Sequence, residues 1–434
     1  MDFDTITIDG SRLLARLDEL SKISAPGVGV TRLAYSSQDI EARKLLGTWM
    51  KDAGLTTITD PVTNLIGTRS GTGLCRKIIA TGSHTDSVVN AGALDGAYGI
   101  VAAIEVAAAL RERELTHDLK IVGFSNEEGA RGSAGTFGSL AIAGQIEPGD
   151  LESVDVEGMS IAKRIQNAHG SPEHLKDAVW EDEILGGFIE LHVEQGPILS
   201  VAEIQIGVVE AITAQGQFEV EITGTANHAG TTPMSARSDA LVAAAHAILA
   251  IESLANPSSD PQATVRVATT GRITSEPGVR NVISNRAVVT ADIRDTDVTK
   301  IKRATQKLAS KLSAIAKETH TEITLRQVQL LDGTRCATEI VAAIDYASNL
   351  LGKATLRMVS GASHDSQSIA KIGPVGMIFV PSIDGLSHSP KESTLPEDLI
   401  AGAQVLLHTI LRLDTSLGCR DNPQTKQKWI RGKT

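Results

Sequence analysis

Residues 77–132 read KIIATGSHTDSVVNAGALDGAYGIVAAIEVAAALRERELTHDLKIVGFSNEEGARG. The runs KIIATG (77–82) and DLKIVGFS (118–125) are short and apolar, and GIVAAIEVAAALRER (99–113) between them has the apolar spacing of a helix. Continuous apolar runs of this length are typical of strands that are covered on both faces of a sheet. A strand, a helix and a second strand in this order predict an α/β layered domain.

The same alternation returns further along the chain. The composition supports it, because 41% of the 434 residues are hydrophobic but only 3% are aromatic. Ala, Val, Ile and Leu must therefore fill the core, as they do in alternating α/β proteins. We expect a central mixed sheet, with further strands at GFIELHVEQ (187–195) and GMIFVPS (376–382) and further helices at 339–351 and 396–413.

The pattern changes near residue 213, where QFEVEITGT (217–225) alternates between apolar and polar residues. From there the order strand, helix, strand, strand, helix, strand predicts a ferredoxin-like α+β unit inserted into the first domain. Its other predicted strands are 263–273, 287–295 and 321–330, and its helices are 239–254 and 297–318. The predicted organisation is a discontinuous catalytic domain (1–212 and 331–420), an inserted domain (213–330) and a polar tail (421–434).

Charge and cysteine content narrow the class of partner. The formal net charge of −11 argues against a nucleic-acid or anionic-membrane partner. The sequence contains no apolar stretch long enough to span a membrane, and the N-terminal MDFDTITIDGSRLL lacks the features of a signal peptide. The three cysteines are far apart and form no CxxC pair, which fits a reducing compartment. We therefore expect a cytoplasmic protein.

Several histidines and acids follow predicted strands or lie in the loops beyond them. In open α/β sheets, sites form outside the carboxyl ends of the strands. A single histidine is more often structural, but repeated placement of this kind favours a site for Zn, Mn, Co or Ni. The candidates are His84, Asp86, Asp95, Glu127, Glu128, His192, His228, His364, Asp365 and His388.

The chain resembles a family of dinuclear-metal amidohydrolases. That family includes N-carbamoyl-L-amino-acid hydrolases, allantoate amidohydrolases and β-ureidopropionases of the peptidase-like type. The matching stretches run from residue 82 to residue 392: GSHTDSVVNAGALDGAYG, NEEGARG, ELHVEQGP, GTANHAGTTPMSARSDAL, RNVISN, SGASHDS and MIFVPSIDGLSHSPKE. The resemblance implies a catalytic domain with an inserted dimerisation or lid domain, and hence a homodimer.

The resemblance also implies two divalent ions per subunit. Asp95 would bridge them, and a bridging carboxylate offsets the repulsion between two cations. Asp86 would hold the other N–H of the His84 ring and so select its tautomer. The implied ligands are His84, Asp95, Glu128, His192 and His388.

By the same resemblance, Glu127 is the general base. The ions would lower the pKa of a shared water, and Glu127 would take its proton and pass it to the leaving nitrogen. Since Glu127 and Glu128 are adjacent, an exchange of their roles stays open at this point.

The substrate contacts implied by the resemblance lie largely on the inserted domain. His228 would stabilise charge on the attacked carbonyl oxygen, and Asn281 and Arg294 would bind a substrate carboxylate. Gln195 and His364 would add further substrate contacts. In this family the residues of the lid domain can reach the site of the partner subunit, and whether His228, Asn281 and Arg294 act on their own site or on the partner's stays open at this point.

The implied reaction is hydrolysis of a linear C–N bond in a small anionic substrate. An N-carbamoyl-L-amino acid is the first expectation, giving the amino acid, CO2 and ammonia. Allantoate or an N-acyl amino acid is an alternative substrate, and a binding protein without catalysis is an alternative class. Three positions depart from the family pattern and leave the substrate open: Gly132 in place of Phe, Ser284 in place of Pro, and Ser363 in place of Gly.

Overall fold

The computed structural model describes residues 6–418 apart from 74, 182–183 and 258–260. It divides into two compact units, Met1–Glu210 with Cys336–Thr434, and Ala211–Arg335. The second unit is a continuous stretch that interrupts the first, and it begins and ends a few residues outside the predicted range 213–330. The predicted tail, 421–434, lies outside the described residues.

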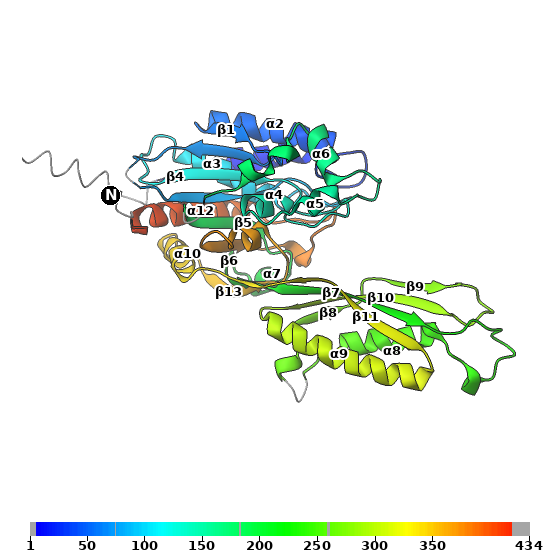
Figure 1. The fold of residues 1–434 in the computed structure, drawn as a ribbon. Helices are drawn as coiled ribbons and strands as arrows, with labels where there is room; N and C mark the ends of the chain where they lie inside the picture. The colour runs from blue at the N-terminus through cyan, green and yellow to red at the C-terminus, as the bar shows by residue number, and fades with distance from the viewer. Residues whose placement is uncertain (1–5, 74, 182–183, 258–260, 419–434) are drawn as a thin grey trace, which may run out of the picture. The chain divides into compact units, whose positions relative to one another are not determined.

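The larger unit is built on a mixed sheet in the order β1-β2-β4-β3-β5-β14-β6, with β13 beside β6 (Figure 1). The central strands β4, β3, β5 and β14 run parallel, and the outer pairs are antiparallel. This confirms the α/β fold class with its mixed sheet. The strands are β1 (Thr56–Thr59), β2 (Leu65–Arg69), β3 (Ile78–His84), β4 (Asp118–Phe124), β5 (Leu185–Val193), β6 (Ile206–Ile212), β13 (Thr355–Ser360) and β14 (Val375–Val380).

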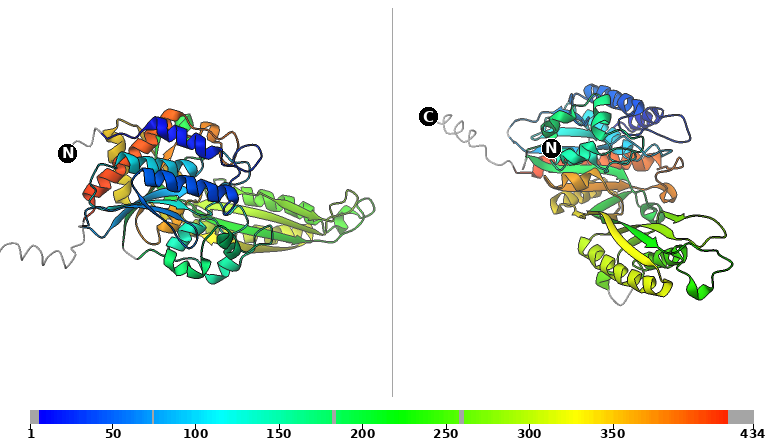
Figure 2. Two further views of the ribbon diagram at one scale, coloured as in Figure 1. Left: turned by 90° about the horizontal axis from the view of Figure 1, so that it is seen from above. Right: turned by 45° about the vertical axis from the view of Figure 1, so that its right-hand side comes forward.

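Helices cover both faces of this sheet (Figure 2). One face packs against α1 (Gly10–Ser21), α2 (Ser37–Asp52), α3 (Ala97–Ala109), α10 (Thr338–Leu350) and α12 (Pro396–Ser416). The other packs against α4 (Phe137–Ile142) and α11 (Asp365–Ile369). On β3, Ile79 points to the first face and Ile78 to the second, and all seven residues are buried. Burial on both faces is the physical reason for the continuous apolar pattern.

Shorter elements connect this framework. They are α5 (Pro148–Glu152), α6 (Ile161–Asn167) and α7 (Ile198–Ala202), with 3-10 turns η2 (Pro172–Ala178) and η5 (Ile383–Gly385). No helix in the described part of the chain is long and apolar enough to cross a membrane.

The parallel strands bring the predicted metal residues to one edge of the sheet. His84 pairs with Phe124 at the end of β3 and β4, and His192 pairs with Phe379 near the end of β5 and β14. Carboxyl ends of parallel strands share an edge, so loops far apart in sequence meet there.

The smaller unit contains an antiparallel sheet in the order β11-β7-β10-β8, with β9 also paired to β10. Two helices lie side by side on one face of this sheet (Figure 1) and bury its apolar side chains. The chain order and the strand order are those of the predicted split βαβ unit. Its elements are β7 (Ala214–Thr223), α8 (Ala240–Glu252), β8 (Val267–Thr269), β9 (Ile273–Glu276), β10 (Arg286–Asp295), α9 (Val298–Thr319), β11 (Glu322–Leu331) and β12 (Thr334–Arg335), with turns η3 (Met234–Ala236) and η4 (Pro261–Ala263).

One predicted strand is wrong in detail. Within residues 263–273, only Val267–Thr269 form a strand, β8, and β9 (Ile273–Glu276) begins at the last residue of that range, beyond Gly271. Arg272 N donates to the side-chain Oγ1 of Thr290 at 3.0 Å, so the ladder is interrupted there. A glycine within a strand commonly marks such an irregularity.

Cys336 is a free thiol in the part of the chain that the structure describes. Cys419 lies outside the described residues. The cytoplasmic location stays a prediction.

Candidate metal centre

The first group of candidate ligands joins three elements of the larger unit. His84 is the last residue of β3, His192 lies in β5, and Asp95 stands two residues before α3. Gly96 makes this approach feasible, because a Cβ at that position would lie 2.4 Å from the His84 ring. Its φ of 63° also favours glycine.

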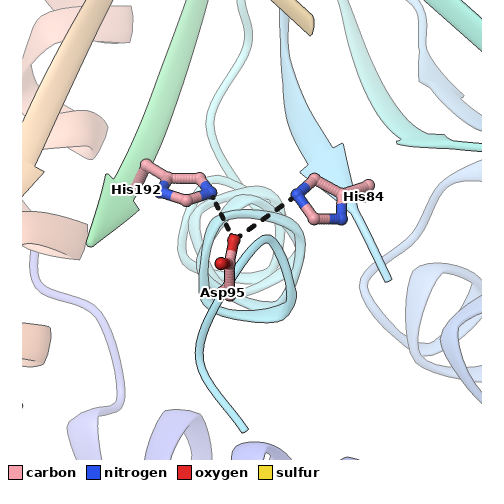
Figure 3. Close-up of side chains that lie close together, drawn as sticks. All are labelled: His84, Asp95 and His192. Carbon is pink, nitrogen blue, oxygen red and sulfur yellow. Dashed lines mark ion pairs between the residues drawn. The ribbon is translucent and has the colours of Figure 1, made fainter. Parts of the chain in front are cut away.

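The three side chains converge on one oxygen (Figure 3). Asp95 Oδ1 lies 3.2 Å from His192 Nε2 and 3.7 Å from His84 Nε2. All three residues are buried. Two imidazole nitrogens and a carboxylate oxygen form a donor set suited to a divalent transition metal.

A second group uses the other oxygen of Asp95. Asp95 Oδ2 lies 3.2 Å from His388 Nε2, which in turn lies 3.4 Å from Glu128 Oε2. The His388 side chain is 48% exposed, in contrast to the 1–3% of His84 and His192. The centre therefore opens to the surface on the side of the second group.

The tautomers fit metal coordination at the first group. His84 Nδ1 lies 2.9 Å from the carbonyl oxygen of Asp86, and His192 Nδ1 lies 2.8 Å from that of Val193. Each Nδ1 must donate to its carbonyl, which leaves Nε2 of each neutral ring as an acceptor close to Asp95. Nε2 of His192 also accepts the backbone N–H of Gly96 at 3.1 Å. In the second group, the buried Oε1 of Glu128 has no hydrogen-bond partner among the described residues. The residues present therefore fit two ions.

The structure corrects the predicted role of the Asp86 carboxylate. The backbone carbonyl of Asp86, and not its side chain, takes the N–H of His84, since Asp86 Oδ1 is 3.9 Å from His84 Nδ1. The carboxylate instead accepts the backbone N–H groups of Glu127 at 3.1 Å and Glu128 at 3.2 Å. Asp86 thus aligns the adjacent glutamates, because its side chain points toward the loop after β4.

Glu127 and Glu128 occupy different positions. Glu128 belongs to the second group, whereas Glu127 belongs to neither and places Oε2 3.6 Å from His84 Nε2. This arrangement favours Glu128 as a ligand and Glu127 as a base beside the ions.

The charges of the cluster shift the pKa values of both glutamates upward. Burial, followed by the charges of Asp365 and Glu128, raises the pKa of Glu127 well above its usual range. Burial and the charge of Asp95 raise the pKa of Glu128 to about 7. An excess of buried carboxylates favours protonation, and cations in their midst would favour the ionised forms.

The charge of Asp95 also raises the pKa values of two imidazoles. Burial acts to lower the pKa of His192, but its hydrogen bond with Asp95 and the Asp95 charge outweigh burial and raise the pKa to about 9. A hydrogen bond with Asp95 also raises the pKa of His388 to about 9. Metal ions must therefore compete with protons for these nitrogens.

Gln195 and His364 both lie at the centre. Gln195 Nε2 donates to Asp95 Oδ2 at 2.9 Å, so its amide nitrogen supports the carboxylate between the two groups. The His364 ring packs edge-on against His192 at 4.8 Å between centroids, and its Nε2 lies 2.8 Å from Ser360 Oγ. Both residues contact ligand side chains as well as being candidates for substrate contact.

Asp365, one of the metal candidates, lies in neither ligand group. It is fully buried, and neither carboxylate oxygen has a hydrogen-bond partner among the described residues. Burial and the charge of Glu190 raise its pKa well above the usual range.

The sequence reasoning missed Ser387 and Glu392. Ser387 Oγ lies 2.9 Å from Asp95 Oδ2, and Glu392 accepts the backbone N–H of Asp95 at 3.1 Å. Their place in the sequence could have indicated them, because both residues stand close to the candidate ligand His388 in the stretch MIFVPSIDGLSHSPKE.

The remaining predicted residues lie on the smaller unit. His228 is exposed, and its Nδ1 accepts the backbone N–H groups of Gly230 at 3.0 Å and Thr231 at 3.2 Å. Asn281 is on the neighbouring segment, which pairs with that of His228. Arg294 is near the far end of β10, where its Nε donates to Asp292 at 2.8 Å.

Comparison with known proteins identifies the family. The profile of peptidase family M20/M25/M40 matches residues 80–412. The chain belongs to this family. It is a hydrolase, and the divalent-metal donor set described above is in keeping with the family.

Relatives within the M20 family cover nearly the whole chain. The N-carbamoyl-L-amino acid amidohydrolase of Geobacillus stearothermophilus is 37% identical over 94% of this chain and 99% of its own length. The ureidoglycolate hydrolase of Oryza sativa subsp. japonica is 34% identical (94% and 85%), and the allantoate deiminase of Arabidopsis thaliana 31% (91% and 80%).

A solved structure shares the fold over the same span. The amidase of the hydantoinase/carbamoylase family from Burkholderia multivorans has a TM-score of 0.84 and 33% identity, covering 96% of this chain and 100% of that one. The resemblance predicted from the sequence motifs is thereby confirmed.

Proposed function

We propose that this M20 hydrolase cleaves a linear C–N bond in an N-carbamoyl-L-amino acid, using two divalent ions. The observation that carries the proposal is that the two carboxylate oxygens of Asp95 face separate ligand groups. The ions would be held by His84, Asp95 and His192, and by Asp95, Glu128 and His388. Zn, Mn, Co and Ni all suit these donors.

Glu127 is the proposed base. When bound, the ions supply Lewis acidity that lowers the pKa of the attacking water. Glu127 takes a proton from that water, and the oxygen of the water bonds to the ureido carbon. As one C–N bond of the ureido group breaks, Glu127 returns the proton to the departing nitrogen. The carbamate that remains on the other nitrogen takes up a proton and decomposes to CO2 and the second amine, so the products are the amino acid, ammonia and CO2.

His228 and Arg294 would act on the substrate. Because His228 Nδ1 accepts backbone N–H groups, the neutral ring carries its proton on Nε2. That N–H can donate to the carbonyl oxygen on which charge develops. Arg294 and Asn281 would bind the α-carboxylate, with the planar guanidinium providing two-point contact.

The spacing within the smaller unit supports a homodimer. Arg294 lies within β10 (Arg286–Asp295), one residue before its end, and Asn281 lies five residues before the strand begins. The stretch of β10 from Arg286 to Arg294 alone spans about 26 Å. One small substrate cannot reach both from a single copy of the unit. We propose that one of these contacts comes from the partner subunit.

A surface for that partner is present on the same unit. Leu241, Val242 and Leu249 on α8 are 44–61% exposed, and β8 stands at the edge of the sheet. An exposed apolar helix face beside an open edge strand suits pairing with a second copy. The test is to mix the inactive variants Glu127→Gln and His228→Ala. Recovered activity supports shared sites, and no recovery in a proven mixed dimer contradicts them.

Allantoate, ureidoglycolate and N-acyl amino acids are the competing substrates. Gly132, with φ of 91°, and Ser363 replace residues that are usual in related sequences, so the substrate side chain or ureido group can differ.

The deciding experiment measures products from metal-loaded protein. N-carbamoyl-L-amino acids, allantoate, ureidoglycolate and N-acyl amino acids are each assayed with Mn, Co and Zn. Ammonia release from N-carbamoyl-L-amino acids at higher kcat/KM than from allantoate or ureidoglycolate supports the proposal. Release of an amine without ammonia from N-acyl substrates, or no activity on any carbamoyl substrate, would overturn it.

A further inference from the structure

Glu392 occupies an unusual position between two loops that carry candidate ligands. It lies four residues after His388, in a turn where Glu392 N donates to Ser389 O at 3.0 Å. Its side chain is largely buried and reaches across to the loop before α3. There Oε2 accepts the backbone N–H groups of Leu94 at 2.8 Å and Asp95 at 3.1 Å.

The other oxygen of Glu392 completes the link. Ser387 Oγ lies 3.0 Å from Glu392 Oε1 and 2.9 Å from Asp95 Oδ2, so its one hydroxyl hydrogen lies between the two carboxylates and can be donated to either. Both oxygens of Glu392 are therefore engaged, one with the backbone of Asp95 and one with the residue before His388. Charge-assisted hydrogen bonds of this kind are roughly twice as strong as neutral ones.

A glycine makes room for this contact. A Cβ at Gly92 would lie 2.2 Å from Glu392 Oε2 and 2.3 Å from Glu392 Cβ. Gly92 thus permits the carboxylate to lie directly against the loop of Asp95.

Asp86 provides a parallel within the same centre. Its carboxylate accepts two successive backbone N–H groups, from Glu127 and Glu128. Asp86 joins the loop of His84 to the loop of Glu128, and Glu392 joins the loop of His388 to that of Asp95. Asp86 thus joins segments whose ligands belong to different groups, whereas Glu392 joins two segments whose ligands, Asp95 and His388, belong to the same group.

We infer that Glu392 is a positioning residue for the second ion, because it fixes the position of Asp95 relative to His388. The inference rests on the proposed two-ion centre. It predicts that loss of Glu392 chiefly affects the ion of the Asp95, Glu128 and His388 group. The first group keeps both of its histidines, which are held by backbone carbonyls.

The test uses Glu392→Gln, which keeps the shape but removes the charge. Metal-free protein is titrated with Mn and Co against a competing chelator, and bound metal is counted after dialysis. Loss of an outer partner of this kind typically costs about 10–100-fold in metal affinity. We expect that loss for one ion, with the other bound nearly as in the wild type. The absorption spectrum of the Co-loaded variant should resemble that of His388→Ala rather than His84→Ala.

Two further variants separate positioning from general stability. Gly92→Ala displaces Glu392 without changing its chemistry and should reproduce the metal phenotype. Asp414→Asn is the matched control, since Asp414 also accepts two successive backbone N–H groups, from Thr116 and His117, ahead of β4. It should lower the unfolding temperature but leave both metal affinities unchanged.

The outcomes are distinct because metal binding is measured without substrate. Unchanged affinity for both ions in Glu392→Gln and Gly92→Ala would overturn the inference, as would an equal loss for both ions. A wild-type protein that binds a single ion would refute the two-ion centre instead.

Discussion

The candidate residues of the two units differ in how they are held. In the larger unit, His84, Asp95 and His192 are buried and oriented by backbone carbonyls and by one another. In the smaller unit, His228 and Asn281 are exposed, and their contacts are local. A buried centre of this kind is prepared by the fold, whereas the exposed residues acquire a role only with a substrate. Substitutions of the ligand residues in the larger unit should therefore affect metal binding, whereas substitutions in the smaller unit should affect catalysis alone.

The largest effect is expected for Glu127→Gln. Removal of the general base should lower kcat by about 10²–10⁴-fold, while both ions stay bound, because Glu127 lies in neither ligand group. Ammonia release and metal content measure the two effects. Glu128→Gln is the matched comparison and should lose metal. If Glu127→Gln lost metal instead, Glu127 would be a ligand and the assigned roles would be exchanged.

The second largest effect is expected for a substitution of His228, an exposed residue of the smaller unit. His228→Ala should lower kcat by about 10²–10³-fold, the usual result of removing one donor to a developing oxyanion. Metal content and the unfolding temperature should not change, because the side chain is exposed. His174→Ala, at an exposed histidine of the larger unit, is the control and should retain full activity. A His228→Ala protein with normal kcat contradicts the proposed role.

A smaller effect is expected for Arg294→Lys, which keeps the charge but loses the planar fork. Loss of one hydrogen bond to a charged group costs roughly 1.5–3 kcal/mol, so KM should rise about 10–100-fold. We expect a smaller change in kcat and none in metal content. Steady-state kinetics on an N-carbamoyl-L-amino acid and on its amide, which lacks the carboxylate, give the measurement. An equal KM increase for both would show that Arg294 does not bind the carboxylate.

The smallest effect is expected in the pH dependence of the stability of the metal-free protein. The folded pKa values of Glu128 (about 7), His192 and His388 (about 9) lie above their ordinary values. The folded state then binds more protons than the unfolded state between about pH 4.5 and 9. The stabilisation that these three groups contribute is fully present below their ordinary pKa values. It is lost as pH rises through their pKa values in the folded state.

Thermal unfolding with a chelator should therefore show a melting temperature that falls from pH 5 to pH 9. Bound metal should reduce this fall, because cations take the place of the protons. Peptide-resolved hydrogen exchange should locate the change in β3 and β5 rather than in β7 and β10. A metal-free melting temperature that rises over this range would contradict the assignment.

Much of the fold was predictable because burial leaves a periodic trace. The strands at 77–82 and 187–195 were predicted because both of their faces are covered, and β7 because its residues alternate between apolar and polar. The short edge strands β1 and β13 were not predicted, since partly exposed runs of four to six residues have little pattern. The break at Gly271 depends on a side-chain contact with Thr290 across the sheet, which local propensity does not register.

By itself, the sequence determined the alternation of strands and helices, the inserted unit and the residue types of the centre, because each depends on local periodicity or on a recognisable motif. Only the tertiary structure decided which oxygen of Asp95 faces which imidazole and what Asp86 and Glu392 hold. Those contacts join loops as far as 297 residues apart. Their geometry follows from the register of parallel strands and from hydrogen bonds between loops, which no local pattern in the chain encodes.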